Sequence, residues 1–353
     1  MKSARRKHRQ QAGIALIIVM LVIVVLTILA AGFAVAMKVE IKLARNAQSE
    51  SEMFLLAWSG VELARYVIGQ QANIPGESSF HALNQKWAGG PGGTNDLLSD
   101  ISLENVELGR GRFTVRIADA ERKLNLNSTR SEVLEQALRK LGVDALDVPM
   151  IIHSIEDWRD LDQNTQLHGA ESDYYLGLDP PYVAKDGPID DISELRLIRG
   201  ITDELYWGVG DERSTRSEFP RIGSSDRSGG LVDLFTTSPG AVRVNINTAS
   251  AAVLRLLPGI GDQLAESIVE ERAGSDLVDG TEDDHPYHSL GELINVRGIL
   301  PLDISTLQRF CGVQSRFFEV EVEVEVDQYT RLFQAQLDAR SPRNITILRA
   351  NWR

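Results

Sequence analysis

The 353-residue chain has 25% charged and 43% hydrophobic residues, a composition that excludes a disordered protein and allows two globular units. Its formal charge of −13 repels the phosphate backbone of nucleic acids, so we expect no nucleic acid among its partners. The single cysteine, Cys311, excludes an internal disulfide, and we expect it to be a buried hydrophobic side chain rather than a nucleophile.

The N-terminal segment joins a basic stretch to a long apolar one. Five Lys and Arg residues lie within the first nine positions, and residues 14–36 contain neither charge nor proline. At about 1.5 Å per residue this run is long enough to cross a bilayer, with the basic end in the cytoplasm and the acidic body outside. The alternative is a secretory signal peptide cut after Ala36, but the apolar run exceeds the ~7–15 residues of a signal core.

The predicted helix continues beyond the apolar run, because no proline interrupts the chain before Pro75. Its second half carries a largely apolar stripe at three- and four-residue steps, which predicts packing against a globular head. The stripe consists of Phe54, Leu55, Trp58, Val61, Ala64, Arg65 and Ile68.

Residues 9–18, RQQAGIALII, resemble a prepilin cleavage site. The resemblance implies that a prepilin peptidase cuts between Gly13 and Ile14, followed by methylation of the new amino group of Ile14. Glycine fits such a site, since a residue without a Cβ lets extended backbone enter a narrow cleft. Most pilins carry a glutamate five residues into the mature chain, but this position is Ile18. In lacking this glutamate, the chain resembles the K-type minor pseudopilin of type II secretion systems, which sits at the filament tip.

An internal repeat lies in the middle of the chain. KLNLNS at 123–128 matches RVNINT at 243–248, and 192–201 matches 288–299. In each unit we predict a short strand ending in a helix cap, Ser128 or Thr248, followed by an amphipathic helix. Each second half is followed by Gly-Val, at 208–209 and at 312–313.

The second unit contains VLRLLPGIG at 253–261, a helix-hairpin-helix pattern. Its glycines permit a tight turn and expose backbone amides, which contact phosphate in DNA-binding proteins of this kind. The flanking acids Asp262, Glu266, Glu270 and Glu271 oppose that use. We therefore expect a structural role, with DNA binding as the alternative.

The predicted fold is α+β: an N-terminal transmembrane and stem helix with a pilin-like antiparallel sheet. Strands are expected at 112–117 and 318–326, and the second alternates valine with glutamate, so that valines can face the stem and glutamates water. Two further strands, near 331–338 and 344–349, would complete the meander.

Two tandem helical units are typical of the K-type family, so the resemblance implies that a large domain of two SAM-like or helix-hairpin-helix units interrupts the sheet. The expected domain boundaries are a leader at 1–13, a transmembrane helix at 14–36, the stem and first part of the head at 37–120, the insert at 121–315 with units at about 121–210 and 241–315, and the last strands at 316–353.

Two acidic stretches, DWRDLDQN at 157–164 and GAESDYY at 169–175, offer carboxylates at alternate positions. Hard cations such as calcium take six to eight oxygens, and a D-x-D-x-N start is typical of calcium loops. The same stretches resemble the signature of K-type pseudopilins, which implies calcium binding in this domain. The predicted ligands are Asp160, Asp162, Glu171 and Asp173. The alternative is a solvated loop ordered by backbone amides.

A second acidic loop at 276–284, DLVDGTEDD, is another possible metal site. His285 and His288 nearby suggest zinc, but no cysteine or third histidine lies at ligand spacing. We therefore expect a surface loop.

The sequence contains no nucleophile elbow, phosphate loop, dinucleotide fingerprint or metalloprotease helix, so we expect no enzyme. The resemblance implies a minor pseudopilin that caps the secretion pseudopilus, initiates its assembly and supports export of folded proteins. Its partners would be the I-, J- and H-type minor pseudopilins, the prepilin peptidase and the inner membrane, with the body in the periplasm. The alternatives are a membrane-tethered receptor for DNA uptake and a secreted adhesive protein.

Overall fold

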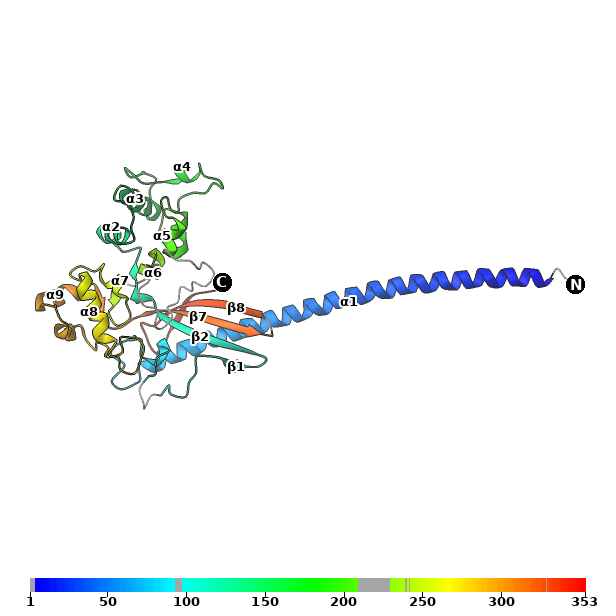
Figure 1. The fold of residues 1–353 in the computed structure, drawn as a ribbon, viewed down its shortest axis with the longest axis horizontal. Helices are drawn as coiled ribbons and strands as arrows, with labels where there is room; N and C mark the ends of the chain where they lie inside the picture. The colour runs from blue at the N-terminus through cyan, green and yellow to red at the C-terminus, as the bar shows by residue number, and fades with distance from the viewer. Residues whose placement is uncertain (1–3, 93–96, 209–228, 239, 241, 328) are drawn as a thin grey trace.

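The computed structural model describes residues 4–92, 97–208, 229–238, 240, 242–327 and 329–353, with the backbone alone at 4–14 and 301–303. A long helix leads into a head made of one sheet and a group of short helices (Figure 1). This arrangement confirms the predicted fold class.

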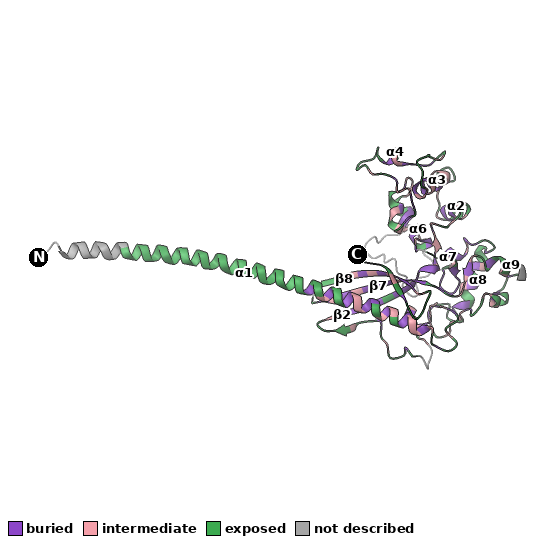
Figure 2. Cartoon of the chain, turned by 180° about the vertical axis from the view of Figure 1, so that it is seen from behind, coloured by how far each residue is buried: buried purple, intermediate pink, exposed green. Residues whose placement is uncertain are grey.

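Helix α1 (Ala4–Gln71) forms the stem without interruption. Its large apolar side chains from Leu16 to Phe33 are 46% to 67% exposed, and Figure 2 shows the stem uncovered until it reaches the head. Among the described residues it is the one helix long and apolar enough to cross a membrane. Such a surface requires lipid or another apolar partner.

The C-terminal part of α1 packs against the sheet, and the predicted stripe is correct at Val61, Ala64 and Ile68, which are buried. It is wrong at Phe54 and Leu55, which are 48% and 65% exposed. The head covers the neighbouring helix face, whose buried residues include Met53, Leu56, Ala57 and Val67. Contact is close at Gly60, where an added Cβ would lie 2.5 Å from a methyl group of Val322.

The sheet has five antiparallel strands in the order β1-β2-β7-β8-β9. They are β1 (Val106–Leu108), β2 (Gly111–Asp119), β7 (Phe317–Val326), β8 (Tyr329–Asp338) and β9 (Thr346–Trp352). All four predicted strands are present, and β2 pairs with β7 although the two lie far apart in sequence. The intervening chain is therefore inserted between two central neighbours of one sheet.

The valines of β7 at 320, 322, 324 and 326 are fully buried on the side of α1, as predicted. The glutamates lie on the opposite face and pair with β2, where Arg112 contacts Glu325 at 2.7 Å. Glu321 contradicts the expectation that these glutamates face water. It is 1% exposed and lies 3.1 Å from a guanidinium nitrogen of Arg116.

Between β2 and β7 the chain forms mostly short helices in two units (Figure 1). The first contains η2 (Ala120–Arg122), β3 (Leu124–Asn125), α2 (Ser131–Lys140), α3 (Val148–Arg159), α4 (Ser172–Tyr175), η3 (Ile192–Leu197), α5 (Asp203–Trp207), α6 (Leu231–Leu234) and β4 (Phe235–Thr236). The second contains β5 (Val244–Asn245), α7 (Ala251–Leu254), α8 (Asp262–Arg272), η4 (Leu290–Asn295), α9 (Pro301–Leu307) and β6 (Cys311–Gly312). The remaining 3₁₀ turn, η1 (Lys86–Ala88), precedes the sheet.

The two units repeat each other down to single hydrogen bonds. In the first, β3 pairs with β4 in parallel, and in the second β5 pairs with β6 in parallel. The side chain of Asn127 donates to and accepts from the backbone of Ile189, and Asn247 does the same with Tyr287. One hydrophobic core runs through both units, so they form one inserted domain.

One detail of the predicted repeat, the position of the helix caps, is wrong. Ser128 and Thr248 lie in turns, and the helices begin later, at α2 and α7, where Arg130 and Ser250 occupy the N-cap positions. Gly208 ends α5, whereas Gly312 lies in β6, and the strand of the first unit that corresponds to β6 is β4. Val209 lies outside the described residues.

A buried polar cluster joins the sheet to the second unit. Asp119, at the end of β2, accepts hydrogen bonds from the hydroxyls of Thr248 and Ser315 at 2.5 Å and from the amide of Asn245 at 3.0 Å. The imidazole Nδ1 of His81 accepts from the backbone of Ser315, and burial lowers its pKa to about 4. Four distant segments, at His81, Asp119, residues 245–248 and Ser315, therefore meet in this cluster, which fixes where the inserted domain leaves the sheet.

Candidate functional site

Three carboxylates meet on the first helical unit. Asp157, Asp160 and Glu171 each offer an oxygen within 4.8 Å of the others. Asp157 lies in the last turn of α3, Asp160 is its C-cap residue, and Glu171 is the N-cap residue of α4. Of the four predicted ligands, the structure therefore brings Asp160 and Glu171 together.

The loop between α3 and α4 closes on Asp157, which is fully buried. The carboxylate accepts from the backbone N–H of Gln166 at 3.3 Å and also receives the backbone N–H of Ala170. Gly169 passes so close that an added Cβ would lie 1.9 Å from Oδ2 of Asp157. Glycine is therefore required here by close approach.

Glu171 has the more unusual environment. The residue is 3% exposed, and neither carboxylate oxygen has a hydrogen-bond partner. Burial, then the nearby negative charges of Asp157 and Asp160, raise its pKa to about 7, and burial also raises the pKa of Asp157. A buried carboxylate without donors is costly, and a bound cation would remove that cost.

An aromatic wall supports the site. Trp158 packs edge-on against Tyr175 at 5.2 Å between ring centroids, and Tyr182 stacks on Tyr175 at 5.2 Å. Trp158 directly follows Asp157 in sequence, and Tyr175 lies four residues after Glu171. Because both aromatic side chains are buried, they hold in place the backbone that carries these carboxylates. The oxygen-only donor set suits calcium or magnesium rather than zinc.

The other two predicted ligands lie outside this cluster. Asp162 is exposed and accepts from the backbone N–H of Asn164 at 2.8 Å, and Asp173 is exposed on α4. Asp186 was missed: it adds negative charge near Glu171, and its buried Oδ1 has no partner. Asp157 was also missed as a ligand, although it opens the first acidic stretch.

Comparison with known proteins gives a consistent result. A family model described as type II secretion system protein K matches residues 111–209, and one for the helix-hairpin-helix motif matches 240–311. The type II secretion system protein K of Pseudomonas aeruginosa is 26% identical across 96% of this chain and 92% of its own length. That of Aeromonas hydrophila is 26% identical over 56% of this chain and 61% of its own.

A solved structure, the GspK-GspI-GspJ complex of enterotoxigenic Escherichia coli, contains a chain of the same fold. The TM-score is 0.64 at 17% identity, covering 88% of this chain and 99% of that one. The chain is thus similar to type II secretion system protein K over nearly its whole length and shares the fold of a solved relative. These similarities support a minor pseudopilin of type II secretion, and the relatives are secretion components rather than enzymes.

The carboxylates of the second acidic loop have hydrogen-bond or ion-pair partners within the chain. Asp283 accepts from the backbone N–H and hydroxyl of Ser275 at 2.7 and 2.6 Å, and Asp284 accepts from the N–H of Gly280. Asp279 pairs with the buried Arg272 at 2.8 Å. In the part of the chain that the structure describes, no cluster of three or more possible metal ligands includes a histidine.

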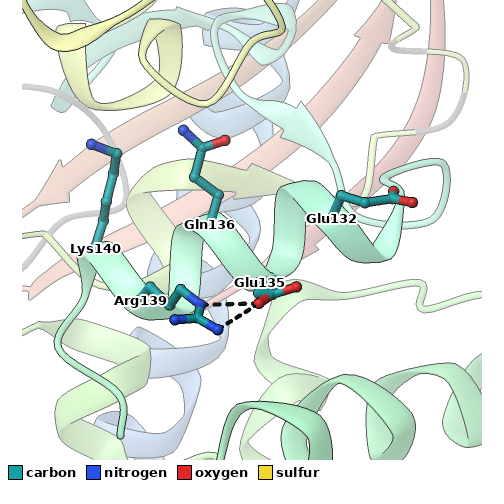
Figure 3. Close-up of a pocket in the computed structure, with 5 residues that line it drawn as sticks. All are labelled: Glu132, Glu135, Gln136, Arg139 and Lys140. Carbon is teal, nitrogen blue, oxygen red and sulfur yellow. Dashed lines mark hydrogen bonds and ion pairs between the residues drawn. The ribbon is translucent and has the colours of Figure 1, made fainter. Parts of the chain in front are cut away.

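A residue of another helix, Lys140 of α2, contacts the helix-hairpin-helix turn. Gly259 has φ +90° and Gly261 is the N-cap residue of α8, as expected for the tight turn. Asp262, in the first turn of α8, accepts from Lys140 of α2 at 2.7 Å. Figure 3 shows Gln136 and Lys140 pointing away from Arg139, which instead binds Glu135 on the same helix. The basic side chains near the hairpin are thus paired with acids.

The predicted processing residues, Gly13 and Ile14, lie within the described backbone of α1. Ile18 follows one turn later and is 57% exposed. Elsewhere, Cys311 is buried in the core of the insert, and burial raises its pKa to about 12, in line with a hydrophobic role.

Proposed function

We propose that this protein caps the tip of a type II secretion pseudopilus, where it initiates assembly and supports the export of folded proteins. The observation that carries the proposal is the stem, whose apolar half is exposed from Ala15 onward and which runs directly into the head. Such a helix is suited first to a membrane and then to a filament core. Immunogold labelling of a C-terminal tag tests the position: one label at a filament end supports it, and labels along the filament contradict it.

Ile18 supports the terminal position. In related filaments, a glutamate at this point is thought to meet the terminal amine of the subunit ahead, because a buried carboxylate needs a partner. An isoleucine makes no such demand, so the subunit requires no neighbour beyond it. The substitution Ile18→Glu should therefore reduce incorporation, which is read from the pseudopilin complex recovered from membranes.

The proposed topology places the N-terminus in the cytoplasm and the head in the periplasm, on a single pass of the inner membrane. A prepilin peptidase would cut between Gly13 and Ile14, after which the amine of Ile14 is methylated. Mass spectrometry of the mature N-terminus tests this. A chain that begins with methylated Ile14 supports it, and one that begins at Met37 points to a secreted protein instead.

The proposed partners are the I- and J-type minor pseudopilins, with the H type beneath them. The support is the solved relative GspK, which was crystallised with GspI and GspJ. Association would depend on packing of apolar stems. Co-production of the four proteins and purification through a tag on this chain tests the assembly.

We further propose that Asp157, Asp160 and Glu171 bind a calcium ion, with Asp186 close enough to add negative charge. The unpartnered oxygens of Glu171 are the main support. The ion would order the α3–α4 loop by neutralising these carboxylates, and it would perform no chemistry.

The alternative of a tethered DNA receptor is supported by the hairpin motif alone. The pairing of Lys140 with Asp262 leaves an acidic surface at the turn. Absence of a mobility shift with duplex DNA at low salt would eliminate this alternative, whereas a salt-dependent shift would favour it.

A further inference from the structure

The inserted domain and the head have separate hydrophobic cores. Buried apolar side chains between Leu126 and Cys311 form one cluster, and those of α1, the five-stranded sheet and the segment that joins them form the other. The chain passes between the two cores twice, at η2, which follows β2, and at residues 313–317, which lead into β7. Polar groups fill this joint, so the joint can change without repacking either core.

Two carboxylates lie in the joint, two residues apart. Asp119 is 1% exposed and Glu121 is 4% exposed. Asp119 accepts hydrogen bonds from the hydroxyls of Thr248, in the second unit, and of Ser315, in the returning chain. Glu121 accepts from the backbone N–H of Arg316, directly before β7. Each carboxylate therefore connects the chain that leaves the sheet with the chain that returns to it.

Every donor that the structure describes at these two carboxylates is uncharged. The donors are hydroxyls, the side-chain amide of Asn245 and backbone N–H groups. His81 adds no charge, because burial lowers its pKa to about 4 and its Nδ1 accepts from the backbone of Ser315. The joint therefore holds buried carboxylates among neutral partners, an environment that favours the protonated form.

The charged groups around the joint do not compensate the pair. They are Arg122, Lys123 and Arg316 from the two crossings, Glu319 from β7 and Asp233 from α6. Burial, followed by the charge of Asp119, raises the pKa of Glu121 to about 7, although the exposed Arg316 opposes this. Burial also raises the pKa of Asp119. Because two ionised carboxylates would repel each other in a buried space, the pair retains one proton up to about neutral pH.

We propose that the joint between the sheet and the inserted domain is a proton-controlled clamp. While Asp119 and Glu121 hold one proton between them, the joint is closed as in the structure. When that proton passes to water, the two charges repel, the joint opens, and the inserted domain pivots on its two chain crossings. The ion pair of Arg349 with Asp191, which also links the sheet to the insert, is exposed and adds little resistance.

The direction of the pH dependence follows from the raised pKa of Glu121. The closed joint retains a proton that a solvated carboxyl group, with a pKa of 4.5, has already lost. The closed form is therefore favoured at low pH, and it is lost as the pH rises through about 7.

The distance between two spin labels measures the pivot in the full chain, kept in detergent micelles. Thr330→Cys on β8 and Glu270→Cys on α8 place the labels at exposed positions, and the buried Cys311 stays unlabelled. We expect one distance distribution at pH 5 and a shifted or broader one at pH 9, with a midpoint near pH 7. Glu171→Gln removes another group that titrates near pH 7, and it should leave this transition unchanged.

Two variants of the joint separate proton control from a purely structural role. Glu121→Gln cannot lose a proton, so the distribution seen at pH 5 should persist to pH 9. Asp119→Asn removes the neighbouring charge, so the midpoint should fall by about one pH unit. A residue with a structural role alone would change stability without moving the midpoint. A transition that keeps its midpoint in Glu121→Gln overturns the proposal.

Hydrogen exchange tests the unmodified protein, so the result does not depend on the folding of any variant. After correction for the intrinsic pH dependence of exchange, the amides of Arg316 and Phe317 should lose protection at least about tenfold between pH 6 and pH 8. The amides in the middle of β7, such as Val322, should keep theirs. Equal protection of the joint at both pH values, or an unchanged distance distribution from pH 5 to 9, overturns the clamp.

Discussion

The two acidic loops of the inserted domain look alike in sequence and differ in the structure. The loop at 276–284 gives its carboxylates their own donors, and hydrogen bonds from Ser275 and Thr281 hold the pKa of Asp283 well below its usual range. The α3–α4 loop buries Glu171 with no donor, and its pKa rises to about 7. The number of acids therefore does not identify a cation site. What distinguishes the two loops is whether their carboxylate oxygens have hydrogen-bond donors, and the candidate cation site is the loop whose buried oxygens lack them.

The largest effect should come from calcium. At a concentration about 100 times the dissociation constant, binding adds about 2.7 kcal/mol and raises the melting temperature by roughly 5–10 °C, and chelation reverses this. Glu171→Gln and Asp157→Asn should each abolish the shift, because each removes a ligand charge. Differential scanning fluorimetry with calcium and with chelator measures it, and identical curves for the unmodified protein would sink the metal proposal.

Variants of the second loop and of the outlying acids sharpen this result. Asp162→Asn and Asp173→Asn change exposed acids outside the cluster, so they should keep the calcium shift. Asp283→Asn should keep it too. Loss of the shift in either outlying variant would extend the site beyond the three carboxylates.

Next in size is the pH dependence of the calcium-free protein. The pKa of Glu171 in the folded state, about 7, exceeds its usual value of 4.5, so the folded state retains a proton that the unfolded state has lost. Stability in chelator should therefore fall as pH rises through this interval. Asp283 contributes the opposite sign, with stability that is lost only as acid protonates it below its usual range.

Glu121 requires a control in that experiment. Its burial near Asp119 also raises its pKa to about 7, so it titrates in the same interval. The difference between the unmodified protein and Glu171→Gln isolates Glu171, since both retain Glu121. Parallel stability curves from pH 5 to 8 would show that Glu171 is not perturbed.

Much of this contrast between the two acidic loops could not be predicted from the sequence. The stem, the strands and the repeat could be predicted, because uncharged length, alternation at β7 and the paired asparagines are local signals. Asp157 belongs to the site because the loop brings Gly169 and Ala170 back into contact with its carboxylate. A contact between residues this far apart in sequence leaves no local sequence pattern from which it could be predicted. Likewise, Phe54 fits an apolar stripe, and only the position of the sheet decides that it stays exposed.

A third test uses the glycine of each loop. Gly169→Ala should displace the chain from Asp157 and weaken or abolish the calcium shift. Gly274 has φ +70°, and an added Cβ would lie 2.2 Å from the backbone oxygen of Asp283, so Gly274→Ala should cost about 1–3 kcal/mol with and without calcium. Urea unfolding in both conditions measures the two costs. A calcium-dependent cost for Gly274→Ala would contradict the separation of the loops.

The smallest effect should come from removing one satisfied acid. Asp283→Asn weakens the charge-assisted bonds from the hydroxyls of Ser275 and Thr281, and since the loop is exposed the loss of stability should be small and independent of calcium. Asp162→Asn is the matched control, as its carboxylate is exposed and accepts a single backbone bond in the structure. Urea unfolding compares the two. Equal stability of both variants would mean that the donors around Asp283 contribute nothing, and donor supply would then no longer explain why only one loop is suited to a cation.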